Sequence, residues 1–448
     1  MRRAAARLTG QLARHAAFAL AVGAAGALAA ALATLALAAA SALSARFPYL
    51  VFALPVLGAA SIGMFRLLRL PLGAQPGSVV EDVRDDDPVP LALAPVALAC
   101  TFLTVLGGGS AGATATALAM SSSAASGLGR LVRVEPIAGR ETGEARRGWT
   151  AACGMAAAFS ALFAAPLAGA AFALELVRFD GAVARRLPAV LAASFAAWFV
   201  ALPLSSGYAL PEAAIPDASW SAGALCLLVG VASAAAGTAF GWSLRALRRT
   251  FCRARAHPAF VAAAGGALLC ALVLAFGWQR FEGSGLALLD GAFSGNAGTF
   301  DFAVKALLTA LTLGVGFKGG EVMPALSVGA LLGATCAGPL GAAPSFAAAM
   351  GAAAFFAAAA RCPLAAVLLS AEAFGWAAAP WAALAVLPAY LLSADVGMFG
   401  RGVTALKDRK RRKGRRAKDG AEAKDEPPIR HGARGERNES DEPDAPQG

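Results

Sequence analysis

Long apolar runs constrain this chain more than any other feature of its sequence. Stretches without a charged residue occur at 16–45, 187–204 and 258–278. A run of about 18 or more such residues can cross a hydrocarbon layer of about 30 Å as a helix. The sequence is 58% hydrophobic and 15% charged, whereas soluble domains carry about 25% charged residues. We therefore predict an all-α polytopic membrane protein in a lipid bilayer, and the unalternating runs exclude a β-barrel.

Basic residues lie at the two ends of the chain and in one internal cluster. The formal net charge is +11, and Lys or Arg gather at 2–14, at 245–255 and from Lys407 onward. Cytoplasmic segments of membrane proteins carry such an excess. We therefore expect both termini and the 245–255 cluster in the cytoplasm, an even number of crossings of the plasma (inner) membrane, and no nucleic-acid partner. The 205–219 loop has no Lys or Arg and is expected outside.

The chain divides into a basic lead at 1–14, a membrane domain at 15–399 and a charged tail at 400–448. The tail composition predicts disorder. The apolar run at 16–45 is longer than the core of a signal peptide, about 7–15 residues, so we expect it to be retained. The first half of the domain covers about 47–204 and the second about 220–399. Helices are predicted at 90–106, 112–126, 149–177 (Pro-broken), 187–204, 220–244, 258–278, 286–293, 303–315, 322–337, 345–374 (Pro-broken) and 381–393.

The two halves share a repeated pattern. G-x11-P-L-A-x6-E occurs from Gly154 to Glu175 and again from Gly351 to Glu372, and G-x-x-G precedes each copy, at 109–112 and 316–319. A Gly-rich break, an apolar helix and a Pro-broken pair, used twice, are typical of transporters with internal repeats. A chance match in an Ala-rich sequence is the alternative. Aligning the two G-x-x-G loops places Thr114 opposite Glu321.

Glu321 is the strongest candidate for a functional charge, because charges within membrane segments are costly. It follows a Gly-rich loop and precedes a predicted helix from Val322. A helix start presents free N–H groups and the positive end of its dipole, which together form an anion site. Lys318 would add positive charge to the access path. Alternatively, Glu321 is only a first-turn acid and Lys318 a loop residue that extends to the membrane surface.

Other polar residues favour structural roles. Glu175 and Glu372 are expected to cap or pair at helix ends, near Arg178 or a loop charge, with a direct transport role as the alternative. Arg361 is interpreted as a loop or interface charge. The seven cysteines include no C-x-x-C, and the three histidines lie far apart. We therefore expect no disulfide framework, no metal site and no cofactor.

The segment at 316–333, GFKGGEVMPALSVGALLG, resembles the CLC anion channels and transporters, and most of all their bacterial fluoride-type branch. Segments at 108–120, 154–176, 354–375 and 389–399 resemble further motifs of the family, so the resemblance runs from about Gly77 to Phe399. It implies a CLC-type inverted repeat of broken transmembrane helices, a homodimer with a pore in each subunit, chloride or fluoride as the permeating ion, and no enzymatic activity.

The resemblance also implies an anion site at the starts of two broken helices. Matching positions are Gly77, Ser78, Gly112, Thr114, Thr116, Gly319, Gly320, Glu321, Val322, Met323 and Phe399.

Three motifs depart from the family pattern. In the family loop GREGT, the glutamate is the gate that competes with the anion and carries the proton, but here the loop reads GATAT, with Thr114 at the gate position. Where the family usually has a threonine, this chain has Met323. Where the family commonly has a tyrosine, this chain has Phe399. Because a Thr hydroxyl cannot titrate, we expect a passive or weakly proton-coupled anion pathway, unblocked at Thr114. The alternatives are a transport-silent homologue with a structural or interaction role and, more distantly, an unrelated transporter with inverted repeats.

Cysteine labelling tests the expected orientation. In a cysteine-free background, Ser440→Cys in the tail should resist a membrane-impermeant maleimide in intact cells and react after permeabilisation. Ser206→Cys, in the 205–219 loop, should react in intact cells. Labelling of the tail position from outside would contradict the orientation.

Overall fold

The computed structural model describes residues 2–70, 89–132, 145–177, 183–204, 207–254 and 256–401. Gly77, Ser78, Arg178 and the charged tail beyond 401 lie outside these ranges. Nearly all of the described chain is helical, as expected for backbone that must satisfy its own hydrogen bonds in lipid. The fold class predicted from the sequence, an all-α polytopic protein, is confirmed.

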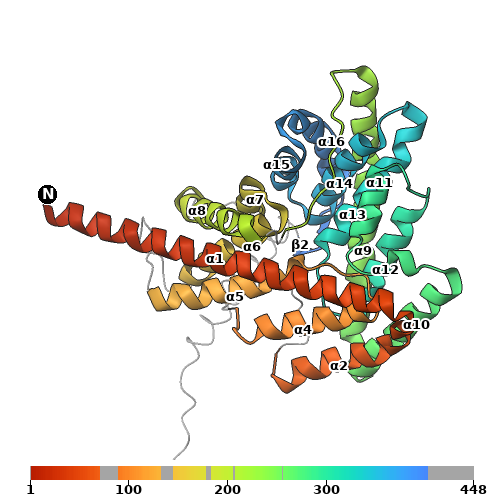
Figure 1. Ribbon diagram of the computed structural model, residues 1–448, viewed down its shortest axis with the longest axis horizontal. Helices are drawn as coiled ribbons and strands as arrows, with labels where there is room; N and C mark the ends of the chain where they lie inside the picture. The colour runs from red at the N-terminus through yellow and green to blue at the C-terminus, as the bar shows by residue number, and fades with distance from the viewer. Residues whose placement is uncertain are drawn as a thin grey trace, which may run out of the picture. The chain divides into compact units, whose positions relative to one another are not determined.

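The first half, red to yellow-green in Figure 1, precedes the loop at 207–219. Its helices are α1 (Arg2–Arg46), η1 (Pro48–Ala53), α2 (Leu54–Leu67), α4 (Leu93–Leu106), α5 (Thr114–Val132), α6 (Ala145–Phe163), α7 (Pro166–Val177), α8 (Val183–Ala201) and η3 (Leu202–Leu204).

The second half, green to blue in Figure 1, follows that loop. Its elements are α9 (Trp220–Arg253), α10 (Pro258–Phe276), η4 (Gln279–Phe281), α11 (Leu286–Phe293), α12 (Asp301–Gly314), α13 (Val322–Ala337), η5 (Gly338–Leu340), α14 (Pro344–Ala360), α15 (Pro363–Phe374), η6 (Trp376–Ala378), α16 (Ala379–Leu392) and the strand pair β1 (Val396–Gly397) and β2 (Gly400–Arg401).

Both Pro-broken pairs lie where the sequence predicts them, α6–α7 and α14–α15. Pro166 and Pro363 stand at the first position of the second helix, where proline is well tolerated because its missing N–H would have no helical partner. Two predicted boundaries are wrong. α1 starts at Arg2, so the basic lead is helical, and α9 continues to Arg253 rather than ending at 244. Arg is a good helix former, which allows both extensions.

Among the described residues, six helices are long and apolar enough to cross a membrane. They are Ala13–Arg46, Pro48–Leu67, Leu187–Leu204, Trp220–Arg253, Pro258–Phe276 and Val322–Leu340. Shorter apolar helices, including both members of the Pro-broken pairs, complete the bundle.

Equivalent elements of the two halves confirm the internal repeat. α4 and α12 each have 14 residues, and each is followed by a glycine with positive φ, Gly108 at 84° and Gly316 at 102°. α5 then starts at Thr114 and α13 at Val322. This spacing is one residue longer than the alignment of the G-x-x-G loops assumes. The structural counterpart of Thr114 is therefore Val322, and pairing it with Glu321 from the repeat is wrong.

The breaks between the paired helices also match. Ala164 and Arg361 occupy the same place in the two copies, and both adopt left-handed backbone, with φ of 52° and 62°. Non-glycine residues rarely adopt this conformation. The same strained turn in both copies shows that they share a backbone path and not only a composition.

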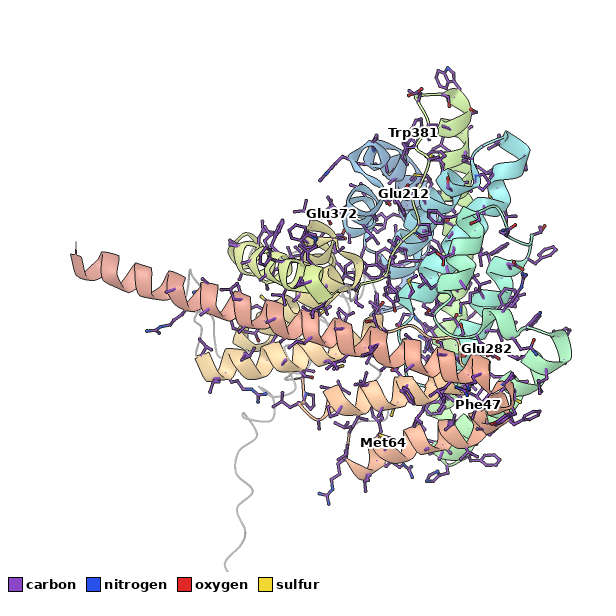
Figure 2. The ribbon with its side chains drawn as sticks, viewed as in Figure 1. Phe47, Met64, Glu212, Glu282, Glu372 and Trp381 are labelled. Carbon is purple, nitrogen blue, oxygen red and sulfur yellow. The ribbon has the colours of Figure 1, made fainter. Side chains whose placement is uncertain are left out.

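Glu175 and Glu372 cap each other's helices. The Glu372 carboxylate accepts hydrogen bonds from the Leu167 and Ala168 N–H groups at the start of α7, at 2.9 and 2.8 Å. In return the Glu175 carboxylate, near the end of α7, accepts hydrogen bonds from the Leu364 and Ala365 N–H groups at the start of α15, at 3.0 and 2.8 Å. Helices α7 and α15 therefore run antiparallel, as inverted repeats require. Figure 2 shows Glu372 at this contact.

The predicted capping role of these two acids is thus confirmed, although the partner is a helix start of the opposite half rather than a nearby basic residue. A carboxylate there interacts favourably with the positive end of the helix dipole as well as with the N–H groups.

Removing either carboxylate should destabilise the contact between the halves. Glu372→Ala and Glu175→Ala each leave two N–H groups without acceptors, at a cost of about 1–3 kcal/mol. We expect a lower melting temperature in detergent for each variant. Glu212→Ala, which alters an exposed acid of the 207–219 loop, is the matched control and should change stability by less than about 0.5 kcal/mol. Equal melting of all three variants would contradict the capping role.

Candidate functional site

The centre of the molecule is a backbone contact between the two glycine loops. Gly112 and Gly320 form an antiparallel bridge in which each N–H donates to the other carbonyl, at 2.8 and 2.9 Å. Since Gly112 lies two residues before the start of α5 and Gly320 two residues before that of α13, the bridge brings the starts of the two helices together. Two of the predicted site glycines are therefore in direct contact.

Only glycines permit this approach. A Cβ on Gly320 would lie 2.7 Å from the Ala115 nitrogen and 3.1 Å from the Thr114 nitrogen. A Cβ on Gly319 would lie 2.4 Å from the Ala111 Cβ, and one on Gly112 would lie 3.0 Å from the Met323 Cβ. The missing side chain at Gly320 allows its backbone to approach the first N–H groups of α5 closely. Those of Thr114 and Ala115 have no hydrogen-bond partner within the described residues.

The hydroxyl of Tyr208 lies at the start of α5. Its hydroxyl oxygen accepts a hydrogen bond from the Ala113 N–H at 3.0 Å. The Thr114 side chain is fully buried beside this hydroxyl, and its own Oγ1 makes no hydrogen bond with any described residue. A tyrosine from the 207–219 loop thus lies next to Thr114, the position that was expected to be unblocked, and that expectation stays a prediction.

Glu321 is the N-cap residue of α13 and is 1% exposed. Its Oε1 lies 3.5 Å from Nη2 of Arg248, near the end of α9, and its carboxylate also accepts from its own backbone N–H. Oε2 has no partner among the described residues. Arg248 is about one quarter exposed and also donates to the Met398 carbonyl at 3.2 Å. This pair connects the centre to the end of α9 that carries the basic cluster.

One of the two interpretations of Lys318 from the sequence is wrong. Its side chain is fully buried, so it does not extend to the membrane surface. Its predicted contribution of positive charge to the access path stays a prediction. The ammonium lies 4.3 Å from the centroid of the Phe65 ring on α2. A cation over an aromatic face is stabilised by the negative face of the ring, which offsets part of the cost of burial.

Three further predicted residues are buried away from water. The Thr116 hydroxyl pairs with that of Thr101 on α4 at 2.7 Å. Val322 and Met323 are fully buried in the first turn of α13.

Phe399 ends a chain of ring contacts that we call the aromatic column: Tyr208, Phe163, Phe159, Phe172, Phe356 and Phe399. Successive centroids lie 5.6 Å apart from Tyr208 to Phe163, 4.7 Å to Phe159, 4.4 Å to Phe172 and 5.9 Å to Phe399. Phe356 packs against Phe159 and Phe172 at 6.2 and 6.1 Å. The column joins the start of α5 to the last described segment through apolar contacts.

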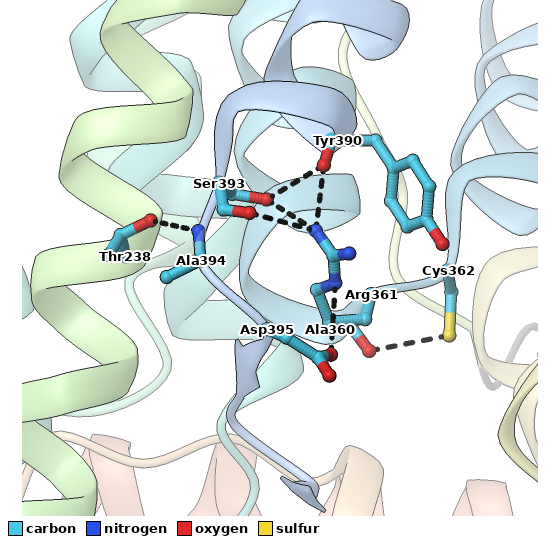
Figure 3. Close-up of polar contacts among 8 residues, drawn as sticks. All are labelled: Thr238, Ala360, Arg361, Cys362, Tyr390, Ser393, Ala394 and Asp395. Atoms are coloured by element: carbon cyan, nitrogen blue, oxygen red, sulfur yellow. Dashed lines mark hydrogen bonds and ion pairs between the residues drawn. The ribbon is translucent and has the colours of Figure 1, made fainter. Parts of the chain in front are cut away.

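Arg361 fixes that last segment. Its Nη1 donates to the Tyr390 carbonyl at 2.7 Å and to the Ser393 hydroxyl at 2.6 Å, and its Nε lies 3.9 Å from Asp395 (Figure 3). The Met398 N–H also donates to the Ala359 carbonyl at the end of α14, at 2.7 Å. Interpreting Arg361 as a structural charge is consistent with these contacts, which hold Phe399 in place.

Sequence reasoning missed several polar residues near the centre. Lys305, fully buried on α12, donates to the Phe281 and Gly283 carbonyls at 2.9 and 2.8 Å, and Glu282 lies between these two residues, against Gly108. A lysine within an apolar helix was the available signal for this pair. Tyr208 gave no such signal, because its loop lies far from Ala113 in the sequence.

Comparison with known proteins agrees with this architecture. The family model described as "Voltage gated chloride channel" matches residues 57–394, most of the chain. The chain is a member of the CLC family. A "Chloride/fluoride channel protein" of Pseudomonas syringae pv. tomato is 31% identical over 369 residues, which cover 79% of this chain and 78% of that protein.

Solved CLC structures share the fold. The crystal structure of a CLC-type fluoride/proton antiporter matches with a TM-score of 0.78 and 26% identity, over 87% of this chain and 97% of that one. The structure of a slow cyanobacterial Cl⁻/H⁺ antiporter matches with a TM-score of 0.73 and 19% identity, over 89% and 98%. The predicted family and its inverted-repeat membrane fold are thereby confirmed.

The Gly112–Gly320 contact should tolerate no side chain. Gly320→Ala would place a Cβ within 3.0 Å of both the Gly112 carbonyl oxygen and the Ala115 nitrogen, so the bridge must open. We expect a clear loss of melting temperature in detergent. Gly63→Ala is the control, because a Cβ on Gly63 in α2 meets no atom within 4 Å, and alanine there should be neutral or stabilising. Equal melting of the two variants would contradict the close contact.

Proposed function

We propose that this CLC protein provides a transmembrane pathway for chloride or fluoride with little or no proton coupling. The observation that carries the proposal is the meeting of two helix starts at the Gly112–Gly320 bridge. Beside this bridge, the N–H groups of Thr114 and Ala115 have no acceptor among the described residues, at a buried site. Buried N–H groups at a helix start form a site for an anion.

Two positive groups near the site also favour an anion. Lys318 precedes Gly319 and Gly320 in the second loop, and Arg248 faces Glu321 at the start of α13. Arg248 also offsets the Glu321 charge, which would otherwise repel an anion. The relatives named above carry chloride, fluoride or both in their descriptions, and this supports the same class of ion here.

Weak coupling follows from the residue at the gate position. Coupled exchange needs a group whose charge changes as it binds and releases a proton. Thr114 supplies a hydroxyl, which donates or accepts hydrogen bonds but stays neutral. With threonine at this position, the anion moves down its own gradient with little proton movement.

A second candidate function is a transport-silent CLC protein with a structural or interaction role. The aromatic column favours it, because its rings fill the interior beside α5 with apolar groups. Met323 and Phe399, both buried, place no hydroxyl where the family pattern has Thr and Tyr. A path lined in this way offers an anion few hydrogen bonds to replace its lost water.

We also propose that the protein is a homodimer in the plasma (inner) membrane, with both termini in the cytoplasm. The CLC fold of the membrane domain and the basic residues near the chain ends support this arrangement.

Restoring an acid at Thr114 tests the proposed mechanism. In proteoliposomes with a chloride or fluoride electrode and an internal pH probe, the wild-type protein should release anion with little proton uptake. Thr114→Glu, alone or with Ala113→Arg and Ala115→Gly, should reduce passive efflux and add proton movement that depends on the anion gradient. The physical reason is that a carboxylate competes with the anion for the same N–H groups when charged and leaves them when protonated.

Thr114→Gln is the matched control, since it has the size of glutamate without its charge and should add no proton movement. Stoichiometric proton uptake by the wild-type protein would refute the argument from Thr114. Wild-type efflux equal to that of empty liposomes, for both anions, would favour the transport-silent function.

A further inference from the structure

We infer that Tyr208 is a neutral plug of the anion site at the start of α5, where its hydroxyl competes with the anion for the Ala113 N–H. This inference rests on the proposed anion pathway and names the residue that limits it. It assigns a function to the 207–219 loop, which otherwise only connects the two halves of the chain.

The hydroxyl of Tyr208 stands where a ligand of the helix start would stand. It accepts the Ala113 N–H at 3.0 Å. The next two N–H groups, of Thr114 and Ala115, have no acceptor in the part of the chain that the structure describes. The fully buried Thr114 Oγ1, which has no hydrogen-bond partner among the described residues, lies beside it. An anion that used all three N–H groups would therefore have to displace the phenol oxygen.

Tyr208 is held in this position by its backbone and by one ring contact. Its backbone N–H donates to the Leu162 carbonyl near the end of α6 at 2.6 Å, and its ring packs against Phe163 at 5.6 Å. Gly207 makes the approach possible, because a Cβ there would lie 2.9 Å from the same Leu162 oxygen. Later in the loop, the Ala214 N–H donates to the Ser345 hydroxyl at 3.2 Å. These contacts therefore hold the phenol in position.

The plug acts from the side of the membrane opposite to the basic cluster. The loop ends where α9 begins, at Trp220, and α9 has 34 residues, about 50 Å at 1.5 Å per residue. The arginines near the end of α9, including Arg248, therefore lie at the far end of this helix. Glu321 meets Arg248 toward that end, whereas Tyr208 contacts the start of α5 from the loop.

A phenol differs from a carboxylate in how it closes the site. Burial raises the pKa of the Tyr208 hydroxyl to about 12, although the hydrogen bond from the Ala113 N–H and the nearby Thr114 hydroxyl oppose this rise. The group therefore stays neutral over the range in which a carboxylate titrates. Its hydrogen bond is weaker than that of an anion, which is charge-assisted. An anion can thus displace it without any proton being exchanged.

The test measures efflux and binding in full-length protein reconstituted in liposomes loaded with potassium fluoride or potassium chloride. Tyr208→Phe keeps the ring on Phe163 and removes only the hydroxyl. Anion efflux should increase about fivefold, as expected for losing one competing hydrogen bond. The stabilisation of the detergent-solubilised protein by added anion should increase by the same factor. Fluoride should gain more than chloride, because the vacated space has the size of a hydroxyl. Tyr208→Ala should increase both.

Tyr49→Phe is the matched control, because it removes a hydroxyl from a tyrosine that is 64% exposed. It should leave efflux and binding unchanged. Melting temperatures of all variants confirm that each is folded. Unchanged efflux and binding in both Tyr208 variants would overturn the inference, and so would a decrease in Tyr208→Phe, which would make the hydroxyl an anion ligand rather than a plug.

The inference and the proposed function can fail separately. Wild-type efflux above that of empty liposomes supports the pathway whatever Tyr208 does. Absent wild-type efflux together with clear efflux from Tyr208→Ala would refute an open pathway in the wild-type protein while supporting the plug. Absent efflux and binding in the wild type and in both Tyr208 variants would overturn both.

Discussion

Every helix that starts inside a membrane exposes N–H groups that water cannot satisfy, and the structure depends on what accepts them. The cost of leaving such groups unpaired in lipid is several kcal/mol each. Four helices of this chain start after a break in the middle of an apolar segment: α5, α7, α13 and α15. Their starts explain which polar residues the chain retains and where its function lies.

The first N–H groups of α7 and α15 are fully capped. Glu372 and Glu175 supply carboxylates to α7 and α15, and each acid belongs to the half opposite to the helix that it caps. These bonds fix two inverted repeats to each other at an antiparallel contact. Because the acceptors are charged side chains of the protein itself, no ion has a place there. The two starts are structural parts of the fold.

The first N–H groups of α5 and α13 are capped only in part. Gly112 and Gly320 satisfy each other, Glu321 folds back on its own N–H, and Tyr208 accepts from Ala113. The next N–H groups of α5 keep no acceptor among the described residues. The nearby charges are satisfied by fixed partners, Lys318 by an aromatic ring and Glu321 by Arg248. The remaining free donors at the centre therefore belong to the backbone, and this is the chemistry of an anion site.

The sequence alone determined the class of fold, the helix order, the repeat and the family. Apolar length, proline position and the spacing of the glycine loops are local properties that can be read along the chain. The pattern of Glu175 and Glu372 also predicted their caps.

Only the tertiary structure decided what meets at the centre. The two glycine loops can be aligned equally well in two registers that differ by one residue. The Gly112–Gly320 bridge shows which register is correct. Lys318 reads in sequence as an exposed cation, yet it lies buried over Phe65 of a distant helix. Tyr208 is an ordinary loop residue until folding brings it to Ala113. Local sequence carries no information about which distant group satisfies a given donor, because that choice is made by packing across the two halves.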